Sequence, residues 1–130
     1  MILVTIYKDQ EGYIGFEAEG HAEYSESGTD IICAAVSVLM TNTANSIEAL
    51  TNDTIVDSSE DGYLTCEFPE GLSPEGTLLV DSMILGLRQV EEIQPTDEND
   101  EPFLKVLTKE VQTCIARSEE RFSRNAETDI

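Results

Sequence analysis

The chain opens with ILVTIYKDQEGYIGFEAE at residues 2–19, the stretch that decides the fold. Its first half is rich in β-branched and aliphatic side chains, and Asp9-Gln10-Glu11-Gly12 has the composition of a turn. After the turn, Ile14, Phe16 and Ala18 alternate with small or acidic residues, which is the period of a half-buried strand. The stretch therefore predicts an N-terminal β-hairpin with one apolar face.

Two later segments have a helical period. In residues 31–50 apolar side chains recur at three- and four-residue steps, and Thr29 or Asp30 precedes them as the predicted N-cap. Ser73-Pro74 opens the second helix with a capping serine and a proline at the first helical position, and Pro95 ends it. We expect the apolar stripes to be buried, with Ile32, Val36, Leu39, Ala44, Ile47 and Leu50 in the first helix and Leu79, Met83, Leu87, Val90 and Ile93 in the second.

Three further strands are predicted at residues 54–58, 63–68 and 103–107. The resulting ββαββαβ order predicts an α+β fold, with two helices packed on one face of a mostly antiparallel sheet. A chain of 130 residues fits one hydrophobic core. We expect residues 1–111 to form the single domain and residues 112–130 to be a weakly patterned C-terminal tail.

The net charge limits the classes of molecule that this protein can bind. Seven basic residues stand against 27 acidic ones, which gives a formal net charge of −20. Binding to nucleic acid through phosphates needs a basic face, and an anionic membrane surface would repel this protein. We therefore expect no nucleic-acid and no membrane partner, and the absence of an uninterrupted run of 18 apolar residues agrees with this. A basic protein or peptide is the partner that the charge favours.

Cysteine usage points to a reducing compartment. Cys33, Cys66 and Cys114 are odd in number and widely spaced, with no C-x-x-C pair, so neither a disulfide framework nor a zinc ribbon is predicted. The N-terminus has neither a basic n-region nor a small-residue cleavage site of a signal peptide. We therefore predict a cytoplasmic protein, with no metal and no cofactor.

The chain has one histidine, so any Cys–His chemistry must use His21. His21 directly follows the second predicted strand, and Cys33 is expected in the first turn of the first helix, where the partial positive charge favours a thiolate. The alternatives are a structural or surface histidine and a small buried cysteine. Cys66 is predicted to be a buried core residue, because it alternates with Leu64 and Phe68 and shares one face of their strand. Residues 22–32, between the pair, are predicted to be a mobile loop that orders over a bound peptide, with Gly28 as a hinge.

The stretch GHAEYSESGTDIICAAVS at residues 20–37 resembles the signature of the bacterial ribosomal-processing cysteine protease family, Prp. The resemblance consists of G-H-A, the downstream G-x-D and C-A-A-x-S, with the histidine and the cysteine at the family's separation. It implies that Cys33 is the nucleophile and His21 the general acid/base. It also implies an enzyme that removes a short N-terminal extension from the precursor of large-subunit ribosomal protein twenty-seven, a basic protein, and that works as a homodimer without a cofactor.

Four further residues match the motif with less defined roles. Asp30 either caps the helix or orients His21. Ser37, one helical turn after Cys33, either bonds the active-site loop or the substrate or is a plain helix-surface residue. Gly20 and Gly28 supply backbone freedom at the two ends of the loop.

Two hypotheses from other classes compete with the protease. One is a non-catalytic acidic binding protein or chaperone for a basic ribosomal protein, which has no need of a nucleophile at a helix N-terminus. The other is a thiol-redox protein, which would need a resolving cysteine near Cys33, and no cysteine lies within thirty residues of it.

Overall fold

The computed structural model describes residues 1–20, 27–96 and 99–112, and of residues 27–30 the backbone only. The elements follow the predicted ββαββαβ order: β1 (Ile2–Asp9), β2 (Gly12–Glu19), α1 (Ser27–Leu50), β3 (Val56–Glu60), β4 (Tyr63–Glu67), α2 (Pro74–Ile93) and β5 (Leu104–Glu110). The α+β fold class is confirmed. The limits predicted for the last three strands differ from these by at most three residues at either end, which is the usual uncertainty of element ends.

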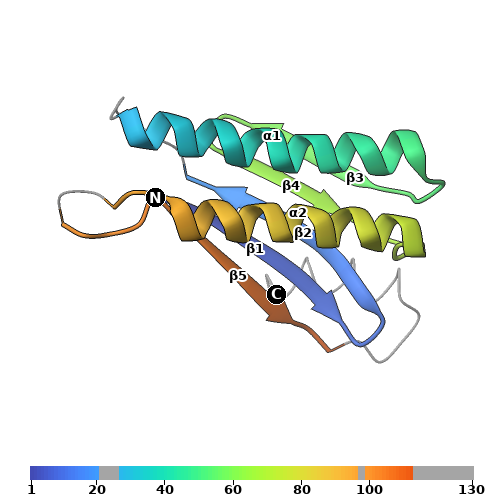
Figure 1. The fold of residues 1–130 in the computed structure, drawn as a ribbon. Coiled ribbons are helices and arrows are strands. Elements are labelled where there is room, and N and C mark those ends of the chain that lie inside the picture. Colours follow the sequence, from blue (N-terminus) through green and yellow to red (C-terminus); the bar gives the residue numbers. More distant parts are fainter. Residues whose placement is uncertain (21–26, 97–98, 113–130) are drawn as a thin grey trace.

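The five strands form one sheet in the order β3-β4-β2-β1-β5. Three of the four neighbouring pairs are antiparallel, and β1 pairs with β5 in parallel, with Leu3 opposite Lys105. Both helices lie on the same face of the sheet, and no helix of the described residues lies on the opposite face (Figure 1). The sequence pattern could not give this strand order, since β4 lies beside β2 although a 24-residue helix separates them in the chain.

The core lies between the helices and the inward-facing side chains of the sheet. Val4 and Ile6 from β1, Phe16 from β2 and Cys66 from β4 are buried against both helices. Phe16 and Phe68 meet edge to face, with ring centroids 5.8 Å apart. The predicted core role of Cys66 is confirmed, and burial next to Asp57 and Glu67 raises the pKa of its thiol to about 12.

The predicted helical stripes are wrong only at their C-terminal ends. Ile32, Val36, Ala44 and Ile47 are buried in α1, together with Met40. Leu50 and Ile93, both predicted to be buried, are 72% and 79% exposed. Each is the last residue of its helix.

The start of α1 differs from the prediction. The helix begins at Ser27, so Thr29 and Asp30 lie inside it and neither is the N-cap. Residues 27–30, predicted to be loop, are helical. Gly28 therefore has helical backbone and is not a hinge at a loop end. The rest of the predicted loop, residues 22–26, lies outside the described residues, as does His21.

The second helix begins as predicted. Ser73 caps it by accepting a hydrogen bond from the Gly76 N–H at 3.0 Å, and Pro74 takes the first helical position. The carboxylate of Asp53 holds the cap in turn, since it accepts hydrogen bonds from both the backbone N–H and the hydroxyl of Ser73. This contact ties the end of the α1–β3 connection to the start of α2.

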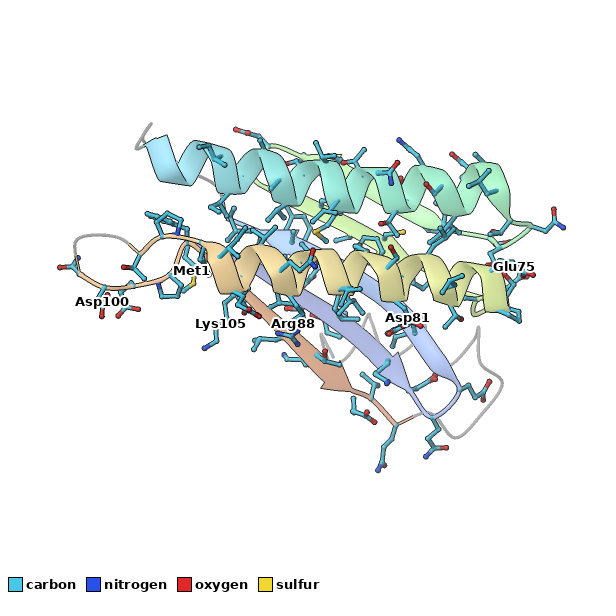
Figure 2. The ribbon with its side chains drawn as sticks, in the orientation of Figure 1. Met1, Glu75, Asp81, Arg88, Asp100 and Lys105 are labelled. Carbon is cyan, nitrogen blue, oxygen red and sulfur yellow. The ribbon has the colours of Figure 1, made fainter. Side chains whose placement is uncertain are left out.

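Side chains near the end of α2 fix the edge strand β5. Gln94 accepts hydrogen bonds from the N–H groups of Phe103 and Leu104 and donates to the Leu104 carbonyl. Arg88 donates to the Val106 carbonyl at 2.8 Å, and it lies over β5 (Figure 2). These bonds satisfy backbone groups that β1 leaves unpaired along the outer edge of the sheet.

By length and composition alone, α1 is apolar enough over Ile31–Leu50 to cross a membrane. One face of this segment nevertheless belongs to the core, through Val36, Met40 and Ile47. A long core helix of a globular domain has the same composition, because its buried stripe supplies most of the apolar residues.

Candidate active site

Cys33 lies on the stretch of α1 that passes over the ends of β1 and β2. It is partly exposed and packs at its apolar side against the core. Neither it nor Cys66 forms a disulfide among the described residues. The two thiols differ in access, since Cys66 has no exposed surface. Of the two, Cys33 is therefore the thiol that a substrate can reach.

Cys33 opens onto a cleft of about 370 Å³. One wall is α1, from which Cys33, Ser37 and Thr41 contribute at successive turns. The floor comes from Ile2 and from the end of β2, with Ala18 and Gly20. The cleft therefore contains three of the residues that the sequence motif singled out: Gly20, Cys33 and Ser37.

The opposite wall is the end of β3 and the turn that follows it, with Ser59, Glu60, Asp61 and Gly62. In the sequence, this stretch is the connection between the strands predicted at residues 54–58 and 63–68. It reaches the cleft because β4 pairs with β2, and the Gly20 N–H donates to the Gly62 carbonyl at 3.0 Å. No local signal in the sequence could have indicated this wall, since it depends on the strand order. Glu60 and Asp61 make the rim acidic.

Gly20 is the residue that joins β2 to the segment carrying His21. Its φ is +96°, a backbone conformation that side chains with a Cβ rarely adopt. A Cβ here would lie 2.2 Å from the Met1 carbonyl oxygen, which is well inside contact distance. The predicted need for backbone freedom at Gly20 is thus supported. For Gly28 it is not, because this glycine lies within the helix.

The remaining motif residues are placed only in part. Asp30 is the fourth residue of α1, and its side chain lies outside what the structure describes. His21 follows Gly20, which lines the cleft, and its own position is likewise outside the described residues. The distance between His21 and Cys33 therefore stays a prediction. In the described part of the chain, no three His, Cys, Asp or Glu side chains gather as metal ligands.

Comparison with known proteins agrees with the motif. The family model of cysteine protease Prp matches residues 1–99. Ribosomal processing cysteine protease Prp of Bacillus subtilis is 37% identical over 98 residues, which cover 70% of this chain and 88% of that protein. The protein of the same name from Staphylococcus aureus is 30% identical over 95 residues, covering 71% of this chain and 90% of its own.

Solved structures show the same fold. The crystal structure of an essential ribosomal processing protease Prp from Staphylococcus aureus, in complex with a substrate peptide, has a TM-score of 0.71 at 26% identity. A second crystal structure of that protease, with a covalently linked product peptide, has a TM-score of 0.68 at 27% identity. Each alignment covers 84% of this chain and all of the crystallised chain. By its sequence, its fold and the cleft at Cys33, this chain belongs to the cysteine protease Prp family.

Proposed function

We propose that this protein is the endopeptidase that removes the N-terminal extension from a ribosomal protein precursor, with Cys33 as its nucleophile. The observation that carries the proposal is the Cys33 thiol, which opens onto the cleft between α1 and the β3–β4 turn. A cleft of about 370 Å³ has room for a few residues of an extended peptide.

The chemistry needs a nucleophile and a proton donor. The Cys33 thiolate attacks the carbonyl carbon of the scissile peptide bond, and the amine leaves with a proton from the imidazolium of His21. The product is a thioester on Cys33. Water, deprotonated by the now neutral His21, attacks the thioester, and the departing sulfur returns to the thiolate. We assign His21 to this role because it is the sole histidine of the chain and follows Gly20 at the cleft.

Ser37 has a position suited to substrate contact. It lines the cleft one turn after Cys33, and its side chain is exposed. We propose that its hydroxyl bonds the peptide backbone next to the scissile bond. Asp30 lies inside α1, because the helix begins at Ser27, so Asp30 is not its N-cap. We therefore assign Asp30 the other predicted role, which is to orient His21.

The substrate class follows from the relatives and from charge. The relatives carry the name ribosomal processing protease, and ribosomal proteins are generally basic. A net charge of −20 attracts such a protein over a distance, and Glu60 and Asp61 place part of that charge at the rim of the cleft.

We extend the proposal to a cytoplasmic homodimer. The odd number and wide spacing of the cysteines support this compartment, and light scattering tests the dimer.

The alternative is a non-catalytic chaperone of the same basic protein. The acidic surface fits this function as well as it fits a protease. The accessible thiol in the cleft favours the protease, because binding alone gives no reason for a nucleophile there.

Incubation with the precursor of large-subunit ribosomal protein twenty-seven separates the two functions, with mass spectrometry of the new N-terminus as the readout. We expect cleavage by the unmodified protein and by Cys114→Ser, and none by Cys33→Ala. We expect His21→Ala to be slower by about 10²–10⁴-fold, the usual contribution of general acid–base catalysis. Full activity of Cys33→Ala would refute the nucleophile assignment, and binding of the precursor without cleavage would favour the chaperone.

A further inference from the structure

The Cys33 cleft continues along α1. A smaller pocket of about 90 Å³ lies between the second half of α1 and the hairpin of β3 and β4. Thr41, Ser59 and Leu64 line both the cleft and this pocket, so the two spaces adjoin. Together they form one groove, the α1 groove, which runs from Cys33 to Asn45.

One wall of the α1 groove is a polar stripe on the helix. Three polar residues follow Cys33 at steps of four, so all of them lie on one side of α1: Ser37, Thr41 and Asn45. All three are exposed. Their hydroxyl and amide groups can bond the backbone of an extended peptide as well as its side chains. The stripe is therefore a row of hydrogen-bonding groups that begins at the nucleophile.

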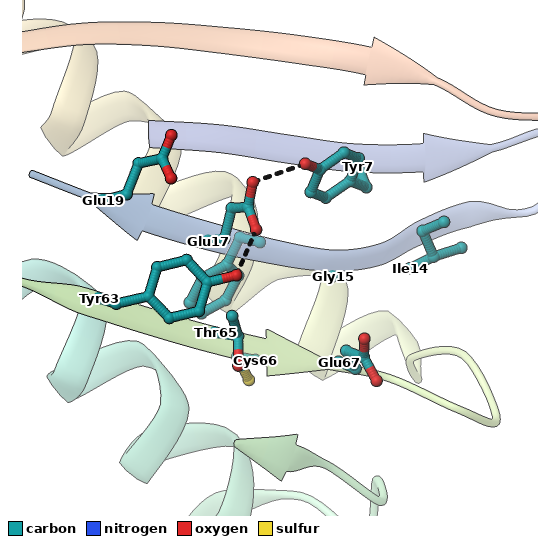
Figure 3. A pocket seen from close by; sticks show the side chains of 10 residues that line it. Tyr7, Ile14, Gly15, Glu17, Glu19, Tyr63, Thr65, Cys66 and Glu67 are labelled. Carbon is teal, nitrogen blue, oxygen red and sulfur yellow. Dashed lines mark hydrogen bonds between the residues drawn. The ribbon is translucent and has the colours of Figure 1, made fainter. Parts of the chain in front are cut away.

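The other wall is β3, the edge strand of the sheet. Asp57 is paired with the buried Cys66, and paired residues of antiparallel strands share a face. Asp57 therefore points to the side of the sheet that carries the helices, where it stays exposed and lines the small pocket. Figure 3 shows the opposite face, to which β4 turns Tyr63 and where Tyr63 donates a hydrogen bond to Glu17. The Asp57 carboxylate thus belongs to the α1 groove.

The length of the α1 groove fits an extended segment of about five residues. Three steps of four residues along α1, from Cys33 to Asn45, are about 18 Å. An extended peptide advances about 3.3 Å per residue. A peptide with its scissile carbonyl at Cys33 therefore has its fifth residue next to Asn45, where the pocket of about 90 Å³ can take one side chain.

The small pocket is suited to a side chain that donates hydrogen bonds. The Asp57 carboxylate, the Asn45 amide and the Thr41 hydroxyl all present acceptor oxygens to it. Its lining residues, within the part of the chain that the structure describes, include no Lys or Arg. A Lys or Arg of a basic substrate that reaches the pocket gains a charge-assisted hydrogen bond to Asp57.

We propose that the α1 groove binds the substrate beyond the Cys33 cleft, and that its pocket between Asn45 and Asp57 takes a Lys or Arg side chain about five residues from the scissile bond. This inference rests on the proposed protease function, because it takes the scissile bond to lie at Cys33. Asp57 is then a specificity-determining residue. A contact this far from the reacting atoms distinguishes one peptide bond from the many others of the same substrate.

Photo-crosslinking on the Cys33→Ala protein tests where the substrate lies, with the precursor of large-subunit ribosomal protein twenty-seven as the probe. The photoreactive residue p-benzoylphenylalanine takes the place of Asn45, of Ser37 in the cleft, or of Glu92, an exposed residue of α2 outside the groove. We expect position 45 to crosslink to precursor residues about four to six positions from the scissile bond, and position 37 to residues next to that bond. Position 92 should give no crosslink.

The crosslinks separate this inference from the proposed function. Crosslinks from position 37 without any from position 45 would refute the α1 groove and leave the protease proposal intact. The absence of crosslinks from both positions would overturn the two proposals together.

The role of Asp57 is tested with peptides that span the cleaved bond and carry either Lys or Met at the crosslinked position. For the unmodified protein, kcat/KM should be higher for the Lys peptide by about two- to fivefold, the effect of an exposed charge pair. In Asp57→Asn the ratio of the two values should fall close to one. The matched control is Glu92→Gln, which changes the net charge equally and should keep the ratio of the unmodified protein. The same ratio in all three proteins would refute the assignment of Asp57.

Discussion

Replacement of Gly20 by alanine tests whether the junction between β2 and the His21 segment positions the active site. With φ at +96°, a residue with a Cβ is strained by about 1–3 kcal/mol. The new Cβ would also lie 2.2 Å from the Met1 carbonyl oxygen, so Gly20 or Met1 must move by about 1 Å to reach normal contact. We expect Gly20→Ala to lower the free energy of unfolding by about 2–4 kcal/mol. Because Gly20 lines the cleft, we also expect cleavage per folded molecule to fall by about 10²-fold.

Gly12→Ala is the matched control. Gly12 also has a positive φ, of +133°, but nothing lies within 4 Å of the position of its Cβ. It is the first residue of β2, after the turn that follows β1, and it does not line the cleft. The control thus carries the backbone strain without the steric clash. Urea denaturation gives the free energies of unfolding, and cleavage of a substrate peptide gives the activities. Equal stability and equal activity of the two variants would refute the proposed role of the junction.

Two further predictions concern stability. The pKa of the Cys66 thiol is raised from 9.0 to about 12, so between these values the folded state keeps a proton that the unfolded state has lost. The contribution of this thiol to the free energy of unfolding is therefore fully present below pH 9 and is lost as the pH rises toward 12. Between about pH 8 and about pH 10.5, ionisation of this one thiol should lower the free energy of unfolding by about 2 kcal/mol. Urea titrations at the two pH values should show a smaller fall, by that amount, for Cys66→Ala. An identical fall in both proteins would contradict the raised pKa of Cys66. Asp53→Ala should cost about 1–3 kcal/mol, because it removes the acceptor of both Ser73 hydrogen bonds. A double-mutant cycle with Ser73→Ala should then show coupling between the two positions, and additive losses would argue against this contact.

The order of the elements could be predicted from the sequence because each element has its own local pattern. Alternation at Ile14, Phe16 and Ala18 indicated a strand, and Ser73-Pro74 indicated a helix start. The start of α1 could not be predicted in this way. Ser, Gly, Thr and Asp at residues 27–30 are typical of caps and turns, and in this chain they form the first turn of a helix.

Half of the candidate site could be predicted from sequence, since Gly20, Cys33 and Ser37 belong to one motif and line one cleft. The opposite wall, at Ser59–Gly62, could not. It becomes part of the site only through the pairing of β4 with β2, which joins residues more than forty positions apart. A one-dimensional pattern carries no information about such a pairing, because either strand could have paired elsewhere with the same alternation.

The early start of α1 places Cys33 further inside the helix than the sequence predicts. In the first turn of a helix, a cysteine would gain from unpaired N–H groups and from the positive end of the dipole. Cys33 is the seventh residue of α1, so its own N–H lies beyond the four that a helix leaves unpaired, and the dipole effect falls off within the first turn. The start of α1 therefore lies more than one turn away from Cys33, and the helix presents the thiol to the cleft. We therefore propose that activation of Cys33 as a nucleophile relies on the imidazolium of His21, on the segment that follows Gly20, and not on the end of the helix.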